Sequence, residues 1–254
     1  MQPEEARSRI AALGFSATDT ETLAAHFDDA ERRGKRGHGH ARIEWLETAT
    51  ADLDPSARAE RELSTQSYEV WDGAGALGYL TLSAVCDAQI AKPPEHARVV
   101  VAKRCFPTGV LGYWVRRLAD AGLVAVLTAT SPRRLSHPEG SPPLAGTNPL
   151  AIGIPSSDGK PVVVDVSPAK ATWGDVIAGH ASEDDVVPFG GDHAHKSFAL
   201  AIGLQLLVDA LTGAGNSESR APEHGALLVV ARPAGDPVPA LRALAGGARL
   251  PGDR

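Results

Sequence analysis

Cysteine is scarce in this chain, and its scarcity excludes several classes of protein. Cys86 and Cys105 are the only cysteines among 254 residues, so a disulfide framework cannot form. The chain has no Cys-x-x-Cys pair, one methionine and few aromatic residues, a composition that does not suggest a haem or iron–sulfur protein. Low cysteine content leads us to expect a reducing, cytoplasmic setting.

Positive charge and long apolar runs are also in short supply. The formal net charge is -6, which argues against nucleic-acid binding. The one dense basic cluster, Arg32 to Arg36, is interpreted as a solvated helix end. We expect no apolar run long enough to span a bilayer, and the start of the chain lacks the apolar segment of a signal peptide. We therefore expect neither a nucleic acid nor a membrane as a partner.

Familiar nucleotide and metal motifs are missing as well. No Gly-x-Gly-x-x-Gly follows a strand, and neither a P-loop nor a His-Glu-x-x-His motif occurs. An ordinary Rossmann nucleotide site is therefore not supported.

Two regions are expected along the chain. Residues 1–55 form a small helical N-terminal region, and residues 56–254 form a mixed α/β domain. In the first region, helices are expected at Glu4–Leu13, from Ser16–Asp19 to about Arg33, and from His40 to Thr48. Residues 51–67 are polar and are expected to form a loop.

The second region mixes helix and strand signals, which predicts an α/β fold on a mixed sheet. A strand, helix and strand follow one another between His96 and Ala129, as in a βαβ unit. The expected elements are a helix at Tyr79–Ala91, a strand at His96–Lys103, a helix at Gly109–Ala121, a strand at Leu123–Ala129, a short helix at Ala169–Ala178, a turn region at Glu183–His195, a helix at Lys196–Leu211, a strand at Ala226–Ala231 and a helix at Val238–Leu244.

The run GTNPLAIGIP, Gly146 to Pro155, is the most informative segment. It leads into the apolar run from Pro161 to Asp165 through a polar turn, which predicts a β-hairpin. Turns of this kind expose backbone N–H groups that can hold a carboxylate or phosphate. Alternatively, the asparagine and glycine serve only the turn geometry.

His38 and Arg42 are the first candidates for chemistry. If a helix begins near Gly39, their four-residue spacing places them on one face. A histidine can give or take a proton near neutral pH, and an arginine can clamp a substrate carboxylate. The pair suits a small 2-oxo or 2-imino acid; the alternative is a surface turn. A metal pair of His38 with His40 lacks a nearby third ligand, so no metal is predicted.

Gly190, Gly191 and Lys196 form a second candidate site. A Gly-Gly turn before a helix places N–H groups at the positive end of the helix dipole, and Lys196 could contact a phosphate there. The alternative is a surface lysine. The neighbouring His193 and His195 are interpreted as exposed loop residues.

Asp165 is a third candidate, at the end of the second hairpin strand. Its carboxylate could orient a ligand, or it could cap the following helix together with Ser167.

These segments, in this order, resemble the malate/L-lactate dehydrogenase family of the sulfolactate dehydrogenase-like fold, which includes Δ1-piperideine-2-carboxylate (ketimine) reductases. Five segments carry the resemblance: His38-Gly39 with Arg42, Asp72-Gly73 to Gly78, Gly146 to Pro149 with Ile154-Pro155 and Asp165, Pro188 to Leu200, and Leu250-Pro251-Gly252.

The resemblance implies a non-Rossmann, NADPH- or NADH-dependent reductase that forms a homodimer, with its site near the subunit interface. By analogy, His38 is the proton donor, and Arg42 binds a substrate carboxylate or organises the site. Thr147 and Asn148 would line the substrate and nicotinamide end. The cofactor-binding residues implied are Asp165, Gly190, Gly191 and Lys196.

The chain departs from the family pattern at several points. Pro107 stands where the family has a second histidine, Gly37 replaces a serine before His38, and Ser197 replaces a glycine. Pro168 and Ala169 replace Thr-Ser, and the segment between Gly174 and Val187 is short.

Two alternative functions are consistent with the resemblance and with these departures. One is a divergent reductase of a small 2-oxo acid or cyclic imino acid, in biosynthesis of a specialised metabolite. The other is a cofactor-free relative, either a non-redox cyclase, isomerase or lyase or a non-catalytic partner subunit.

Overall fold

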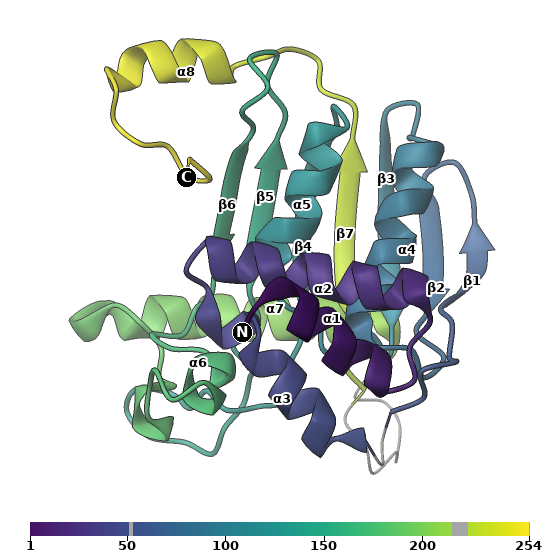
Figure 1. Cartoon of the computed structure of the whole chain (residues 1–254). Helices are drawn as coiled ribbons and strands as arrows, with labels where there is room; N and C mark the ends of the chain where they lie inside the picture. Colours follow the sequence, from purple (N-terminus) through teal and green to yellow (C-terminus); the bar gives the residue numbers. More distant parts are fainter. Residues whose placement is uncertain (51–52, 215–222, 254) are drawn as a thin grey trace.

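A seven-stranded mixed sheet runs through the molecule in the order β1-β2-β3-β7-β4-β5-β6 (Figure 1). The computed structural model describes residues 1–50, 53–214 and 223–253. The strands are β1 (Glu60–Ser64), β2 (Tyr68–Asp72), β3 (Ala97–Lys103), β4 (Val124–Ala129), β5 (Leu150–Ile154), β6 (Val162–Val166) and β7 (Ala226–Ala231).

Helices cover both faces of the sheet. The helices are α1 (Pro3–Ala12), α2 (Ala17–Arg32), α3 (Ala41–Thr48), α4 (Gly78–Ala91), α5 (Leu111–Asp120), α6 (Trp173–Ile177), α7 (Ala194–Thr212) and α8 (Val238–Ala245), with short 3-10 turns η1 (Arg36–His38), η3 (Glu183–Asp185) and η4 (Gly191–His193).

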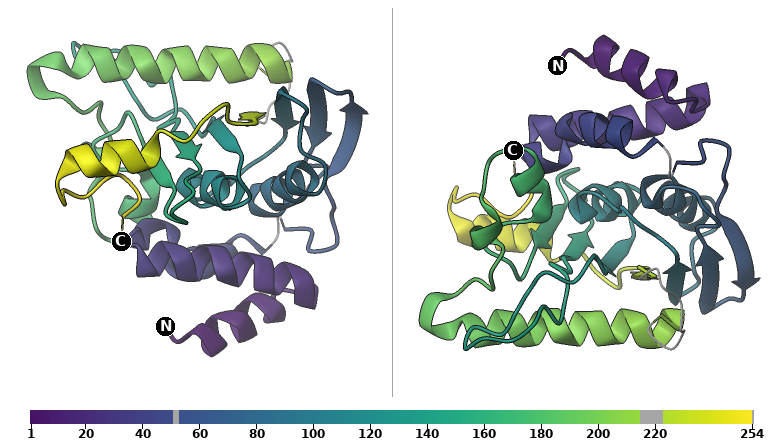
Figure 2. Two further views of the ribbon diagram at one scale, coloured as in Figure 1. Left: turned by 90° about the horizontal axis from the view of Figure 1, so that it is seen from above. Right: turned by 90° about the horizontal axis from the view of Figure 1, so that it is seen from below.

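The layers follow from the apolar faces of these helices. Helix α7 lies on one face of the sheet, whereas α1 and α2 lie on the opposite side of the molecule (Figure 2). Helix α5 contacts both α2 and strands β4, β5 and β6, and α4 packs beside it against α2 and α5. The amphipathic pattern of α5 explains its place, because Leu111, Trp114, Val115 and Leu118 recur at helical spacing and are all buried.

One hydrophobic core joins the N-terminal helices to the sheet. It contains Ile10 and Phe27 from the helices together with Val100 and Leu127 from the strands. The N-terminal helices therefore pack as part of the same core, and the expected division at residue 55 stays a prediction.

The hairpin and most of the expected helices agree with the structure, but the helix expected at Ala169–Ala178 begins only at Trp173, and Ala169 forms an isolated β-bridge with Pro188. Strands β5 and β6 pair antiparallel, with Ala151 opposite Asp165, as the Gly146–Pro155 run predicts. The helix expected to start at Lys196 begins two residues earlier, at Ala194. Ser16 accepts a hydrogen bond from the amide of Asp19, which is the capping predicted for α2.

The segment 51–67, expected to form a loop or an exposed connection, contains the strand β1; its first two residues lie outside the described residues. All five residues of β1 are exposed, so the strand has no apolar face that a sequence pattern could reveal. It is an edge strand that pairs with β2 alone.

The βαβ expectation needs one correction. Strands β3 and β4 run parallel to each other on either side of α5 in sequence, but β7 lies between them and pairs antiparallel with both. The directly paired parallel strands are β2 and β3, which α4 connects. Pairing between distant strands leaves no local sequence signal.

Helix α7 corrects the expectation that no apolar run could span a bilayer. By length and composition, Gly191–Thr212 could cross one, although a third of its apolar window (33%) is buried. That buried face contacts β3, β4 and β7, and its Gln205 hydrogen-bonds Asp209 and Asn148. These contacts are those of a helix packed on a protein core.

Candidate active site

A cavity of about 190 Å³ lies where η1, the start of α5, the Gly146–Pro149 turn and the end of β6 meet. Three of the predicted site residues, His38, Thr147 and Asp165, line it together. They come from positions far apart in sequence. Its walls are largely apolar, from Phe106, Pro107, Val110, Leu111 and Pro149, and its polar groups include Lys35, Ser131, Ser167, Thr172 and Asp175.

His38 has one weak polar contact in this cavity. Its Nε2 lies 3.5 Å from Thr172 Oγ1, and its Nδ1 is buried with no partner among the described residues. Because Thr172 Oγ1 donates to Asp175 Oδ2 at 2.7 Å, it can only accept from His38. This network assigns the neutral ring a proton on Nε2.

The electrostatics around His38 favour the neutral ring. Burial, together with the positive charges of Arg42 and Lys35, lowers the pKa of His38 to about 3. His38 is therefore uncharged at neutral pH in the substrate-free protein. Binding of an anion beside it would raise this pKa.

Lys35 is the one cationic lining residue among the described residues of this cavity that the sequence analysis did not predict, which also include Ser131, Thr172 and Asp175. Its Nζ lies 3.3 Å from Asp165 Oδ2, and the Lys35 side chain is 43% exposed. It belongs to the basic cluster that was interpreted only as a solvated helix end. Its spacing of three residues before His38 was the available signal.

Asp165 caps a helix, but not the one that follows it. Its Oδ2 accepts a hydrogen bond from the amide of Gly112 at 3.1 Å, at the start of α5. Ser167 instead donates to Thr147 O. Asp165 thus fastens β6 to α5 while facing the cavity, a tertiary contact that local sequence could not indicate.

Arg42 lies behind the cavity rather than in its wall. The side chain is buried, Nε donates to Gly37 O at 3.0 Å, and the guanidinium lies 5.7 Å from the centre of the Trp45 ring. Its predicted pairing with His38 on one helix face is wrong, since η1 ends at His38 and α3 begins only at Ala41. This placement suits the site-organising alternative for Arg42.

Asn148 is also buried, whereas its neighbour Thr147 reaches the cavity. Asn148 Nδ2 donates to Ala201 O and Gln205 Oε1, and Asn148 Oδ1 accepts from the amide of Ser131. These bonds tie the turn to α7 and hold Thr147 in the cavity wall.

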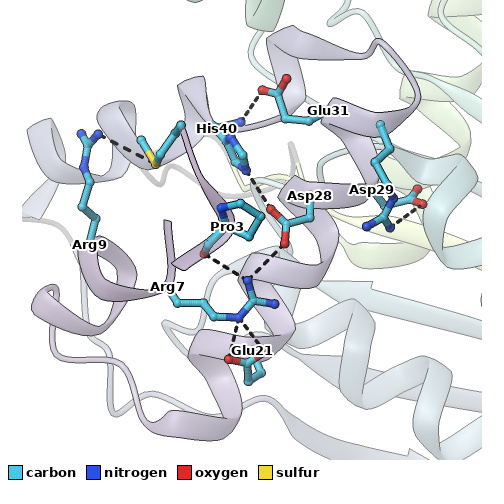
Figure 3. A network of polar contacts seen from close by, with 10 residues as sticks. Pro3, Arg7, Arg9, Glu21, Asp28, Asp29, Glu31 and His40 are labelled. Atoms are coloured by element: carbon cyan, nitrogen blue, oxygen red, sulfur yellow. Dashed lines mark hydrogen bonds and ion pairs between the residues drawn. The ribbon is translucent and has the colours of Figure 1, made fainter. Parts of the chain in front are cut away.

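The turn that carries His38 is held by close backbone packing. A Cβ on Gly37 would lie 2.6 Å from the amide of Asp175, and one on Gly39 would overlap the Glu31 carboxylate. Glu31 accepts a hydrogen bond from the amide of His40, and the His40 ring contacts Asp28 (Figure 3). His40 therefore points into an ion-pair network and not toward His38.

The predicted cofactor residues do not gather in one place. Gly190 and Gly191 line a separate hollow of about 490 Å³ beside Arg134 and Lys170. Lys196 is exposed in the first turn of α7 and lines neither this hollow nor the His38 cavity. Within the described part of the chain, no three His, Cys, Asp or Glu side chains group as metal ligands would.

A family model for malate/L-lactate dehydrogenase matches residues 4–186. The chain belongs to the malate/L-lactate dehydrogenase family. This match includes η1, the hairpin and every lining residue of the His38 cavity.

Relatives within the malate/L-lactate dehydrogenase family are named oxidoreductases. A (2R)-3-sulfolactate dehydrogenase (NADP(+)) from Chromohalobacter salexigens is 28% identical over 89% of this chain and 77% of its own length. A Δ1-pyrroline-2-carboxylate/Δ1-piperideine-2-carboxylate reductase from Pseudomonas putida is 26% identical over 87% of this chain and 74% of its own.

Solved structures in the family share the fold. A dehydrogenase from Sinorhizobium meliloti superposes with a TM-score of 0.80 at 25% identity, covering 100% of this chain and 90% of its own. The Δ1-piperideine-2-carboxylate reductase from Pseudomonas syringae gives a TM-score of 0.84 at 24% identity, covering 99% and 89%. The expected fold is thereby confirmed.

Proposed function

We propose that this protein is a nicotinamide-dependent reductase of a small cyclic imino acid. The proposal rests on one observation: among the described residues, His38 is the only histidine that lines the cavity, and it is neutral there. Pro107, which lines the same cavity, has no side-chain group that can donate a proton. The dehydrogenase and reductase relatives support the reaction class.

The neutral state of His38 separates the two substrate classes. A 2-oxo acid gains a proton on oxygen as it is reduced, so His38 would first have to be protonated and then donate that proton. An imino acid can arrive as an iminium, whose nitrogen already carries its proton. Hydride addition to the carbon of that iminium gives the amine with no further proton. A neutral His38 then needs only to accept a hydrogen bond from the iminium N–H, through its unpartnered Nδ1.

The cavity suits a ring that carries one carboxylate. Phe106, Pro107 and Leu111 give it apolar walls. Lys35 is the cationic side chain in the wall, and its ammonium can shift from Asp165 to bridge the substrate carboxylate. We assign substrate-carboxylate binding to Lys35, with Arg42 holding the backbone of the His38 turn.

The residues present also fit the nicotinamide end of a cofactor. A nicotinamide needs a flat apolar surface and partners for its carboxamide, and the cavity offers the hydroxyls of Ser131, Thr147 and Ser167 beside its apolar wall. When bound, the reduced cofactor supplies the hydride. The NADP(+) in one relative's name makes NADPH the first cofactor to test.

The proposed setting is the cytoplasm, as a homodimer. Cys86 and Cys105 are both free and buried, and a reducing compartment preserves such thiols.

The deciding experiment measures cofactor binding first and turnover second. Calorimetric titration with NADPH and NADH should show micromolar affinity for one of them. Initial rates should then be higher with Δ1-piperideine-2-carboxylate or Δ1-pyrroline-2-carboxylate than with pyruvate. Absence of binding by either nucleotide to the folded protein would refute the proposal and favour the cofactor-free, non-redox alternative. Faster reduction of pyruvate would refute the substrate class.

A further inference from the structure

A second, larger hollow on this molecule is lined mainly by positive side chains. It has a volume of about 560 Å³ and lies between the end of α2, α5, the β5–β6 turn and the C-terminal segment. Its lining contains two acidic residues, Asp120 and Asp253, and five basic ones, Arg33, Arg116, Lys160, Arg242 and Arg249.

This excess of positive charge is unusual for the chain as a whole, whose formal net charge is -6. Part of it is neutralised internally, because Arg242 pairs with Asp158 at 3.2 Å and with Asp253 at 2.8 Å. Arg33 similarly pairs with Asp29 at 2.9 Å. Lys160, Arg249 and Arg116 add the remaining positive charge to the wall.

Arg116 carries the argument furthest. Its Nη1 is buried and has no hydrogen-bond partner among the described residues. The Arg116 side chain as a whole is half-buried, and a buried N–H group without an acceptor costs free energy because its desolvation is not offset by a hydrogen bond. Burial, followed by the charge of Arg33, lowers the pKa of Arg116, and the nearby carboxylates of Asp29, Asp120 and Asp165 offset this only in part. An anion in this hollow would add negative charge beside Arg116 and an acceptor for its unpartnered N–H group.

We propose that this basic hollow binds phosphoryl groups of a phosphorylated ligand. Guanidinium groups bind phosphate oxygens in pairs, through two parallel hydrogen bonds. Arg116 contributes a guanidinium group from the helix, and Arg249 and Lys160 add charge from the C-terminal segment and the hairpin turn. A carboxylate would pair with one guanidinium group, whereas a diphosphate can contact several of these cations at once.

The basic hollow is a near neighbour of the His38 cavity. Three elements contribute to both. After α2, Arg33 lines the hollow and Lys35 lines the cavity. On α5, Arg116 lines the hollow and Leu111 lines the cavity. On the third element, the β6 segment, Pro161 lines the hollow and Asp165 lines the cavity. Leu111 and Arg116 are separated by about 8 Å along the helix, and Pro161 and Asp165 by about 13 Å along the strand.

Two sources of phosphoryl groups are consistent with this placement. One is the phosphate end of a dinucleotide whose nicotinamide lies at His38, in which case the inference deepens the proposed function. The other is a separate phosphorylated metabolite that binds independently of the cofactor.

The test uses inorganic pyrophosphate as the probe and the full chain as the protein. Calorimetry should show saturable binding that weakens as salt is added. Arg116→Gln should weaken it by about tenfold or more, as expected for loss of one charge-assisted contact. Arg249→Gln, at an exposed position, should weaken it without affecting folding.

Arg117→Gln is the matched control. Arg117 is the next residue of α5, but it pairs with Asp87 at 2.6 Å and does not line the hollow. Its pyrophosphate affinity should stay within about twofold of the wild type. Equal affinity in wild type, Arg116→Gln and Arg249→Gln would overturn the proposal, as would absence of saturable pyrophosphate binding to the wild type.

Competition with NADPH separates the two sources. If the basic hollow holds the cofactor phosphates, pyrophosphate should compete with NADPH, and Arg116→Gln should weaken both. If it holds a separate metabolite, pyrophosphate and NADPH should bind together, and Arg116→Gln should weaken pyrophosphate alone. Either result leaves the phosphoryl site standing. Failure of NADPH to bind at all, with pyrophosphate still bound at Arg116, would instead count against the proposed reductase.

Discussion

His38 is the residue on which the proposed chemistry depends. Replacing it with alanine removes the hydrogen bond to the substrate nitrogen, and we expect kcat to fall by about 100-fold or more. Initial rates with the imino acid, together with calorimetric binding of NADPH, measure the effect. His96→Gln is the control, because the His96 side chain is 90% exposed. Unchanged kcat in His38→Ala would remove His38 from the mechanism.

Arg42 should matter for stability more than for substrate affinity. Arg42→Lys loses the Nε–H bond to Gly37 O and the planar contact with Trp45. We expect the free energy of unfolding in urea to drop by about 1–3 kcal/mol. Lys35→Gln provides the contrast, with a raised KM and little change in stability. If instead Arg42→Lys raised KM at unchanged stability, Arg42 would be the carboxylate clamp after all.

A second buried histidine predicts how stability depends on pH. His26 is fully buried, its Nε2 accepts from the amide of Val110, and burial lowers its pKa to about 3. The unfolded chain takes up a proton below pH 6.5 and the folded chain does not, so stability is lost as pH falls toward 3. At pH 5 the loss is about 2 kcal/mol relative to neutral pH.

Urea unfolding at pH 7 and pH 5 measures this loss. His26→Gln removes one titrating group, so its stability should change less between the two pH values than that of the wild type. An identical pH dependence in both proteins would show that His26 is not the source.

At the scale of elements, the contact between η1 and α6 determines where His38 lies. Gly37 packs against the backbone of Gly174 and Asp175, where a Cβ would come within 2.6 Å. Gly37→Ser restores the family residue but should cost about 1–3 kcal/mol through overpacking and should lower kcat. Gly235→Ser, at a position with open space, is the control for thermal unfolding. Full stability of Gly37→Ser would contradict this packing.

Elements with their own periodic pattern were predictable from sequence, and contacts between distant elements were not. The spacing of Leu111, Trp114 and Leu118 in α5 is visible in a single segment. By contrast, Lys35 and Asp165 are 130 residues apart, and nothing local shows that they meet. His38 could be identified by its motif, but the burial of Arg42 and Asn148 depends on Trp45, Ala201 and Gln205.

At the scale of the whole molecule, the outer face of α7 is the expected homodimer contact. Leu200, Leu206, Leu207 and Leu211 are 39% to 62% exposed on this face. Gly203, at the middle of the helix, would place a Cβ in open space, so the isolated chain gives no reason for a glycine that costs about 1 kcal/mol in a helix. The α7 of a second copy, crossing closely at Gly203, would explain the glycine.

Leu206→Glu should therefore convert a dimer into a monomer in light scattering. Two copies crossing antiparallel at Gly203 would bring Lys196 of each near Asp209 of the other, which adds charge complementarity. Leu244→Glu on α8 is the control, because Leu244 is 85% exposed away from this face. A wild-type monomer would refute the dimer.

The two edges of the sheet have a consequence for how copies of this protein meet. At one edge, β1 carries Glu60, Arg61 and Glu62, all exposed, with an irregular register beside them. At the other edge, the amide of Val163 on β6 is already bonded to Pro251 O. Charge, a bulge and an occupied amide each discourage strand addition. Concentrated solutions should accordingly resist fibril formation, since neither edge offers a template on which sheets could grow.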